Sequence, residues 1–572
     1  MVLFFIFSFS LFMLWDGWQK DFAKRQAPAT SAAGSGASAA PATGIGAVPT
    51  PSAPATPTGA AALPGAVGAV VAPAALASNG IASMQIKTDV FNAQISAEGG
   101  DLRYLELLQH KDTDDKKKNF VLLEYQSTHT YLAQTGLIGG DGSLPTHKSV
   151  FTLPASAATL KDGEAKLTVR LEAVTKDGSK IAKIYTFNRG AYVVDVAYEI
   201  TNAGTAALAP TVYLQLVRDG KPPAGDSKFL STYTGGAFYT EVNKFQKQDF
   251  SDISKKKPVP TKSADTGWVG IIQHYFVSAW IPPDKTTREY FNSVTPKTPD
   301  NRLTDDLHAV GATMPLATIQ PGATGTYSAR LYAGPQDQDS MAKIAPGLDL
   351  TVDYGWLTII AQPMFWLLTW LHKWVGNWGF AIILLTVIIK AIFFPLSAAG
   401  YRSMARMKAV TPKMTAIRER YGSDKMKMNQ AMMELYKTEK INPLGSCFPI
   451  VVQIPVFLAL YWVLLAAVEF RHQPFILWIT DLTAQDPFYI LPILMAITMW
   501  FQTKMNPVPP DPVQAQVMKI MPFVFAIFFF FFPAGLVLYW VVNNILSIAQ
   551  QWQITKMIES GNDPEKQKPT KK

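Results

Sequence analysis

The chain has 572 residues, 48% of them hydrophobic, and a formal net charge of +9 at pH 7. It is too long for one domain and too hydrophobic for an ordinary soluble protein. The basic excess does not indicate DNA binding, since Lys and Arg next to apolar segments mark membrane topology. A single cysteine, Cys447, excludes an intramolecular disulfide, and the scattered histidines predict neither a metal site nor a cofactor.

The N-terminal 1–20 segment is expected to be a membrane anchor. Residues 2–15 are apolar, and Trp15 and Trp18 suit a membrane interface. A cleaved signal peptide is the alternative, but the basic region that begins such a peptide is missing. The run is short for a span of about 20 residues, so a longer native N-terminus is also considered. Residues 26–83 follow as an uncharged, Ala/Pro/Gly-rich segment, which predicts a disordered spacer.

Residues 84–345 have the pattern of a β-domain. Apolar and polar side chains alternate along 166–173 and again along 192–200, as in strands with one buried face. Turn signals such as Lys176-Asp177-Gly178 separate these strands. The segment predicts a large antiparallel β-sandwich, without a Gly-rich phosphate loop or a Gly-x-Ser-x-Gly elbow that would suggest an enzyme.

An aromatic segment at 353–376 leads from the β-domain to the apolar part of the chain. Trp366, Trp370, Trp374 and Trp378 recur at every fourth residue, which predicts one stripe along a helix. Because polar residues interrupt the segment, we expect an amphipathic helix in the membrane interface, not a span.

The core at 377–556 is predicted to contain five membrane spans. Their expected bounds are 379–397, 447–468, 487–504, 519–532 and 535–551. The loop after the first span is strongly basic, the 469–486 loop is acidic, and the 557–572 tail is basic again. The positive-inside rule therefore predicts a cytoplasmic first loop and C-terminus, with the β-domain on the outside. Together with the anchor, this makes a multi-pass protein.

Lys390 is the one charge within the first expected span. Burying it costs roughly 2.5–3.5 kcal/mol on insertion scales, which suggests a functional reason for keeping it. Thr386 lies one turn earlier, and Gln453, Asn543 and Asn544 are polar residues in other spans. These groups could line one wet cavity, or they could hold helices together by hydrogen bonds. Snorkelling of Lys390 to the interface is a further alternative.

The basic loop 398–440 is predicted to be a cytoplasmic helical hairpin. Apolar residues recur at helical spacing on both sides of a break at Tyr421-Gly422-Ser423. Methionines that could contact varied apolar partners, or simply hold the two helices together, are Met404, Met407, Met414, Met428 and Met432. Basic residues of the hairpin and tail could contact anionic lipids.

Several short motifs resemble the YidC/Oxa/Alb family of membrane protein insertases, in its Gram-negative YidC form. They are Asn377-Trp378-Gly379-Phe380, Lys390 to Pro395-Leu396, Asn442-Pro443-Leu444-Gly445, Cys447-Phe448-Pro449, Gln453-Ile454-Pro455 and Phe532-Pro533-Ala534-Gly535-Leu536. The resemblance covers about 353–556 in the expected order. The outer β-domain, spacer and anchor resemble the Gram-negative form more weakly.

The resemblance implies a bacterial inner-membrane protein, not an enzyme, with a periplasmic β-domain. It also implies a hydrophilic, positively charged groove through which newly made membrane proteins are inserted, alone or with the Sec translocon. By motif, the groove residues are Lys390, Thr386, Gln453, Phe457, Tyr539 and Trp540. Implied partners are nascent membrane proteins, the Sec translocon and the ribosome. Many members have arginine where this chain has Lys390, and lysine lacks the rigid guanidinium fork.

Two other classes remain open at this point. A secondary transporter would use an intramembrane charge, but it usually shows inverted repeats, and the sequence has none. A membrane-anchored periplasmic protein that binds or modifies carbohydrates would explain the sandwich but would leave the cytoplasmic hairpin without a role.

Overall fold

The structure is a computed structural model that describes residues 81–560. Within this range it leaves out 114, 127, 140–142, 224–231, 298–304, 423, 440–447 and 507–511. The described residues fall into two units that meet in sequence between Asp353 and Tyr354. The predicted anchor 1–20, nearly all of the spacer, the Asn442–Cys447 motifs and the tail beyond Ser560 lie outside the described residues.

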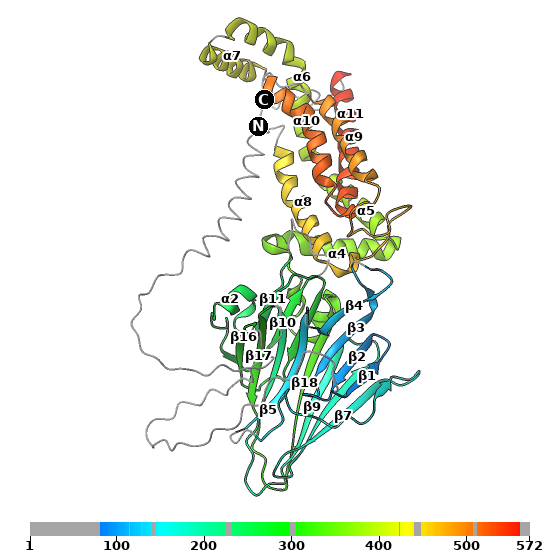
Figure 1. Ribbon diagram of the computed structural model, residues 1–572. Coiled ribbons are helices and arrows are strands. Elements are labelled where there is room, and N and C mark those ends of the chain that lie inside the picture. The colour runs from blue at the N-terminus through cyan, green and yellow to red at the C-terminus, as the bar shows by residue number, and fades with distance from the viewer. Residues whose placement is uncertain are drawn as a thin grey trace, which may run out of the picture. The chain divides into compact units, whose positions relative to one another are not determined.

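The first unit is a sandwich of two large sheets (Figure 1). The ten-stranded sheet has the order β13 (Ser263–Ala264), β16 (Arg288–Thr295), β17 (Leu307–Pro315), β10 (Thr211–Asp219), β5 (Thr130–Ile138), β4 (Asn119–Tyr125), β3 (Leu102–Lys111), β2 (Phe91–Ser96), β1 (Ser83–Lys87), β6 (Ala157–Thr159). The eight-stranded sheet has the order β12 (Lys244–Asp249), β11 (Gly235–Thr240), β14 (Trp268–Gln273), β15 (Phe276–Ile281), β18 (Thr324–Pro335), β9 (Val193–Thr201), β8 (Lys180–Asn188), β7 (Lys166–Val174).

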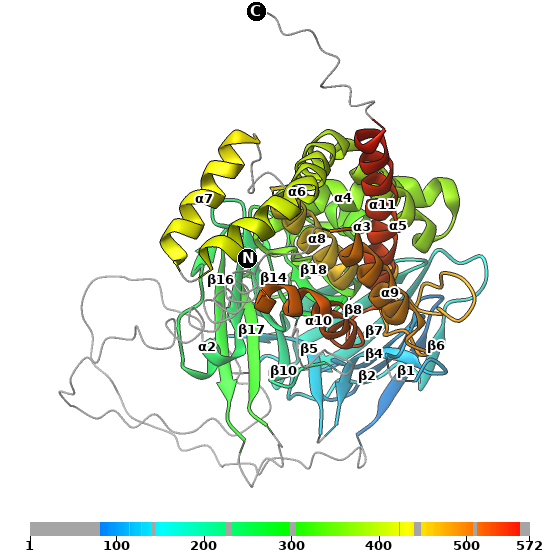
Figure 2. The same cartoon turned by 90° about the horizontal axis from the view of Figure 1, so that it is seen from above.

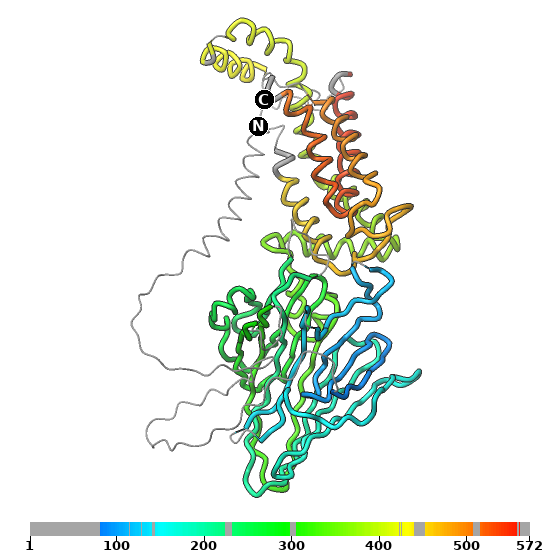
Figure 3. Tube along the Cα trace, viewed as in Figure 1, coloured from blue at the N-terminus to red at the C-terminus, as the bar shows by residue number. Residues whose placement is uncertain are grey.

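The predicted antiparallel sandwich is confirmed, with one parallel pair between β1 and β6. Side chains alternate between buried and part-exposed along β9, as the period-two pattern predicted. The two inner faces meet through hydrogen bonds as well as apolar packing. The hydroxyl of Tyr131 donates to the Ile271 carbonyl at 3.3 Å, and the indole of Trp280 donates to the Gln215 carbonyl at 3.0 Å. Figure 3 follows the chain through both sheets, from blue to green.

Short helices complete this unit, and longer ones form the second. The first unit contains α2 (Phe250–Ser254), α3 (Gln338–Ile344) and the 3₁₀ turn η2 (Asp349–Thr351). The second contains η3 (Gly355–Leu357), α4 (Thr358–Val375), α5 (Trp378–Ile392), α6 (Phe394–Tyr421), α7 (Lys425–Thr438), α8 (Phe448–Ala466), η4 (Val468–Phe470), α9 (Ile490–Met505), α10 (Pro512–Phe529) and α11 (Ala534–Glu559). In this bundle, α11 packs against α5, α6, α8 and α9, and α4 packs against α5 and α8.

The expected tryptophan stripe is one residue shorter than predicted. Trp366, Trp370 and Trp374 are exposed on α4, opposite a buried apolar face. Trp378 does not continue this stripe, because α4 ends at Val375 and is capped by Gly376 in the left-handed conformation, which glycine adopts easily. Trp378 instead begins α5 and is buried, with its ring 4.0 Å from that of His372.

The helix expected over 379–397 is broken. It ends at Ile392, and the next helix starts at Phe394 at an angle of 67°. Pro395 explains the break, because proline has no N–H to continue the α5 hydrogen bonds but fits the first turn of a new helix. Lys390 therefore lies in the last turn of α5, closer to a helix end than the sequence suggested.

No single helix among the described residues is both long enough and apolar enough to cross a membrane. The bent pair α5 and α6 is long and apolar enough when the two helices are taken together. There are also three shorter apolar helices, at Val452–Ala466, Ile490–Met505 and Ala515–Phe529. The number of spans and their orientation remain predictions.

The hairpin 398–440 is two helices side by side, as Figure 2 shows for α6 and α7. The break falls where it was predicted. α6 ends at Tyr421, and the Asp424 carboxylate then caps α7 by accepting from the Lys427 N–H at 3.1 Å.

Candidate functional site

Lys390 lies inside the helical bundle. Lys390 is only 6% exposed. Its Nζ donates a 2.7 Å hydrogen bond to the Oγ of Ser547 on α11. No carboxylate of the described residues forms an ion pair with it. The ammonium is thus partnered by a neutral hydroxyl of another helix in the interior, which favours a hydrogen bond between helices over snorkelling.

A chain of hydrogen bonds continues from this hydroxyl to a third helix. Ser547 Oγ donates to the main-chain carbonyl of Asn543 at 2.7 Å. The side-chain oxygen of Asn543 in turn accepts from the amide of Gln453 on α8. Lys390 and Gln453, which the sequence analysis had placed in one groove, are therefore joined through α11. Asn543 belongs to the same network.

The three aromatic candidates also come together. The Phe457 ring on α8 lies 4.5 Å from the Trp540 ring, edge to face, and 6.1 Å from the Tyr539 ring, measured between centroids. Tyr539 is 1% exposed. These rings form an apolar wall between α8 and α11, next to the Gln453 contact.

Thr386 does not face Lys390 as a free polar group. It is 1% exposed, and its hydroxyl donates to the Ile382 carbonyl one turn earlier at 2.7 Å. Threonine commonly makes this bond to its own helix. Its expected contribution to a wet groove is therefore weaker than the sequence analysis suggested.

Two further polar contacts join α11 to the α9 segment: one comes from Asn544, which the sequence already suggested, and one from Gln551, which it did not. Gln551 donates from its amide to the side-chain oxygen of Asn506 at 3.0 Å, and Asn544 donates to Thr498 at 3.4 Å. Spacing could have revealed part of this network, because Asn543, Ser547 and Gln551 repeat every four residues and thus share one face of α11.

The methionines of the hairpin mostly hold it together. Met414 is 4% exposed and packs with Val410, and Met407 and Met432 cover this pair. Met404 lies 3.9 Å from the Gln551 amide, and Met428 is half-buried.

Two methionines that were not singled out are far more accessible than these. Met426 is 84% exposed and Met433 is 56% exposed. They are the better candidates for contacts with an incoming partner.

The Asn377-Trp378-Gly379 motif fixes the start of α5 to the loop between α8 and α9. Asn377 accepts from the Phe380 N–H, which caps the helix, and its amide donates to the carbonyls of Pro474 and Phe475. The start of α11 is held by the same loop, since Gly535 N–H donates to the Leu482 carbonyl at 2.9 Å. These two family motifs therefore organise one end of the bundle.

Gly379 is required by the close approach of Phe475. A Cβ at this position would lie 2.0 Å from Cδ2 of the Phe475 ring. We expect Gly379→Ala to displace the ring and lower the free energy of unfolding by about 1–3 kcal/mol. Thermal unfolding in detergent should show this loss. In a Phe475→Ala background the same glycine substitution should cost little, whereas an equal loss in both backgrounds would contradict the steric explanation.

The β-domain contains a buried ion pair that the sequence analysis missed. Lys183 and Asp101 each have 0% side-chain exposure, with Nζ 2.8 Å from Oδ1. The ammonium also donates to the carbonyls of Gly99 and Thr135, so its three N–H groups are satisfied. Burial raises the pKa of Asp101 to about 6, although Lys183 opposes this shift, and burial lowers the pKa of Lys183. A signal existed, because Lys183 shares the buried face of β8 with Ile181 and Tyr185.

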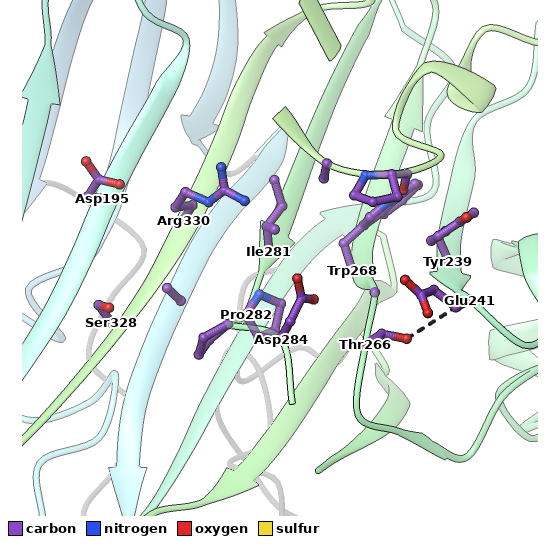
Figure 4. A pocket seen from close by; sticks show the side chains of 15 residues that line it. Asp195, Tyr239, Glu241, Thr266, Trp268, Ile281, Pro282, Asp284, Ser328 and Arg330 are labelled. Carbon is purple, nitrogen blue, oxygen red and sulfur yellow. Dashed lines mark hydrogen bonds between the residues drawn. The ribbon is translucent and has the colours of Figure 1, made fainter. Parts of the chain in front are cut away.

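A cleft of about 260 Å³ also opens in the β-domain (Figure 4). Side chains from neighbouring strands line it, among them Asp195, Arg330, Ile281 and Trp268. Arg330 lies opposite Asp195 on one side and Ile281 on the other in the strand register. Trp268 is fully buried and its indole N–H donates to the Pro346 carbonyl, so it offers no open aromatic face to a sugar.

Comparisons with known proteins cover both units. A family model described as the YidC periplasmic domain matches residues 83–367, and one described as the 60Kd inner membrane protein matches 370–562. The membrane protein insertase YidC of Aromatoleum aromaticum is 53% identical over 98% of each chain. The chain belongs to the YidC family of membrane protein insertases. The YidC protein of Dechloromonas aromatica is 52% identical, over 98% of this chain and 97% of the relative.

A solved structure titled as an active YidC insertase with its first transmembrane domain resolved is also similar. It covers 81% of this chain and 90% of its own, at 17% identity and a TM-score of 0.38. The YidC family is not enzymatic. The two family models that match this chain describe a periplasmic domain and an inner-membrane protein. The transporter and carbohydrate-binding alternatives have no support from these family matches.

Proposed function

We propose that this chain inserts newly made proteins into the bacterial inner membrane through the polar interior of its helical bundle. The observation that carries the proposal is the buried Lys390, joined through Ser547 and Asn543 to Gln453 and flanked by an aromatic wall. The polar groups would lower the cost for a hydrophilic substrate segment to enter the bilayer. The apolar part of the substrate would then move into lipid, driven by burial of its surface.

Substrates enter the polar interior from the cytoplasmic side in this proposal. The multi-pass core has its hairpin and C-terminus in the cytoplasm and its β-domain in the periplasm. Anionic lipids and the ribosome would contact the basic hairpin and tail, and the Sec translocon would be an optional partner. Lys390 supplies positive charge that attracts acidic substrate segments.

Expression of the chain in a bacterium depleted of its own insertase tests the proposed function. We expect growth to be restored, together with normal insertion of small inner-membrane proteins. If the chain accumulates in the membrane but neither growth nor insertion returns, the proposed function is wrong.

The β-domain should be dispensable for insertion. Removing 90–320 while keeping α4 is expected to leave growth in the depletion strain intact, because the proposed site lies entirely in the other unit. Immunoblots of membranes should confirm equal amounts of the shortened chain. Loss of growth at normal protein level would show that the β-domain takes part in insertion.

The hairpin should be the first part to meet a substrate. Photo-crosslinkers at the exposed Met426 and Met433 are expected to capture short nascent chains on stalled ribosomes. A crosslinker at Thr480, exposed in the loop between α8 and α9, is the control and should capture only longer chains. Early capture at Thr480 alone would mean that the hairpin is only a structural brace.

A further inference from the structure

One face of α11 connects three other segments of the bundle. Asn543, Ser547 and Gln551 follow at intervals of four residues, and all are less than 9% exposed. Each makes a side-chain contact with a different segment: Gln453 of α8, Lys390 of α5 and Asn506 at the end of α9. The middle contact is the one that involves a charge.

The Ser547 hydroxyl has a fixed polarity. Its single proton is directed to the Asn543 carbonyl at 2.7 Å, so its lone pairs are left to accept from the Lys390 ammonium at 2.7 Å. A hydroxyl that donated in the opposite direction would repel the ammonium. The helical geometry of α11 thus prepares Ser547 as an acceptor at the depth of Lys390.

A lysine needs such an anchor more than an arginine does. Its ammonium is a point charge on a flexible four-carbon stem, whereas guanidinium is a rigid fork. Without the Ser547 bond, the ammonium could move among several positions in the bundle. With it, one N–H is used and the other donors keep a defined direction.

We propose that Ser547 is a positioning residue that holds the Lys390 ammonium in place for acidic groups of the inserting substrate. This inference rests on the proposed insertion function. Ser547 acts only through Lys390 and does not touch the substrate itself. Its contribution should therefore depend on charges in both the insertase and the substrate.

The test compares Ser547→Val with Ser547→Thr. The valine and threonine side chains have nearly the same shape, but only threonine has a hydroxyl. The full chain is reconstituted in liposomes and given a small membrane protein with acidic residues in its translocated segment. The second substrate is the same protein with those residues changed to Asn or Gln. We expect Ser547→Val to reduce insertion of the acidic substrate about tenfold, as for loss of a hydrogen bond to a charged group. Ser547→Thr should retain most of it.

Two comparisons separate positioning from a structural role. Insertion of the neutral substrate should change less than about twofold in Ser547→Val, and Ser547→Val should have no further effect in a Lys390→Met background. Equal losses for both substrates, equal activity of the Val and Thr variants, or an additive loss in Lys390→Met would each overturn the positioning role. Failure of the unsubstituted chain to insert either substrate would instead refute the proposed function.

Discussion

Charge reversal at Lys390 is expected to reduce insertion by at least about tenfold, whereas Lys390→Arg should retain most of it. A glutamate would repel acidic substrate segments, and like charges placed together cost several kcal/mol. It would also face the Ser547 oxygen, whose proton is already directed to Asn543. The measurement is protease protection of a newly made small membrane protein in the depletion strain.

Lys166→Glu serves as the matched control for this charge reversal. Lys166 is exposed on β7, outside the unit that holds Lys390, so its reversal should leave insertion unchanged. Equal insertion by the Lys390→Glu and Lys390→Arg variants would mean that the charge has no role.

Loss of Lys183 should strongly destabilise the β-domain. Lys183→Met leaves the Asp101 carboxylate buried without its cation, which typically costs about 3–5 kcal/mol of unfolding free energy. The loss should be visible as a lower denaturation midpoint of the β-domain. Hydrogen exchange of the β8 amides in the full chain, in detergent, measures this midpoint. Adding Asp101→Asn to this variant should restore much of the stability, because the buried charge is then removed.

The loss caused by Lys183→Met should also depend on pH. Burial already raises the pKa of Asp101 from 3.8 to about 6, and removing Lys183 removes an influence that lowers it. In the variant the folded-state pKa therefore lies further above the unfolded value. Folding then favours the protonated carboxyl, and this stabilisation is lost as pH rises through the folded pKa. The destabilisation should be smaller at pH 5 than at pH 8, and an equal loss at both would contradict the buried-charge explanation.

The sequence predicted the features that depend on local patterns. Alternation along 166–173 and 192–200 predicted strands, and the break at Tyr421 in the hairpin was placed correctly. Short motifs of the helical bundle were sufficient to suggest the insertase family. These signals are local because side-chain periodicity follows directly from helix and strand geometry.

Features that depend on tertiary contacts were missed or misplaced. Trp378 was assigned to the α4 stripe because spacing alone does not show that Gly376 ends the helix. The expected continuous helix through Lys390 overlooked Pro395 as the start of a new helix. Ser547 was not recognised because its partner, Lys390, is 157 residues away in sequence. The ion pair of Asp101 and Lys183 was missed for the same reason, since these residues are 82 positions apart.

Insertion by the purified chain alone shows most directly whether its polar interior can insert membrane proteins. The full chain is reconstituted in liposomes without nucleotide or other proteins, and a small two-span membrane protein is synthesised in its presence. We predict protease-protected substrate fragments well above those of protein-free liposomes, and a strong decrease with Lys390→Glu. No protection above protein-free liposomes, with the chain folded and correctly oriented, would contradict the proposed role of its polar interior in insertion.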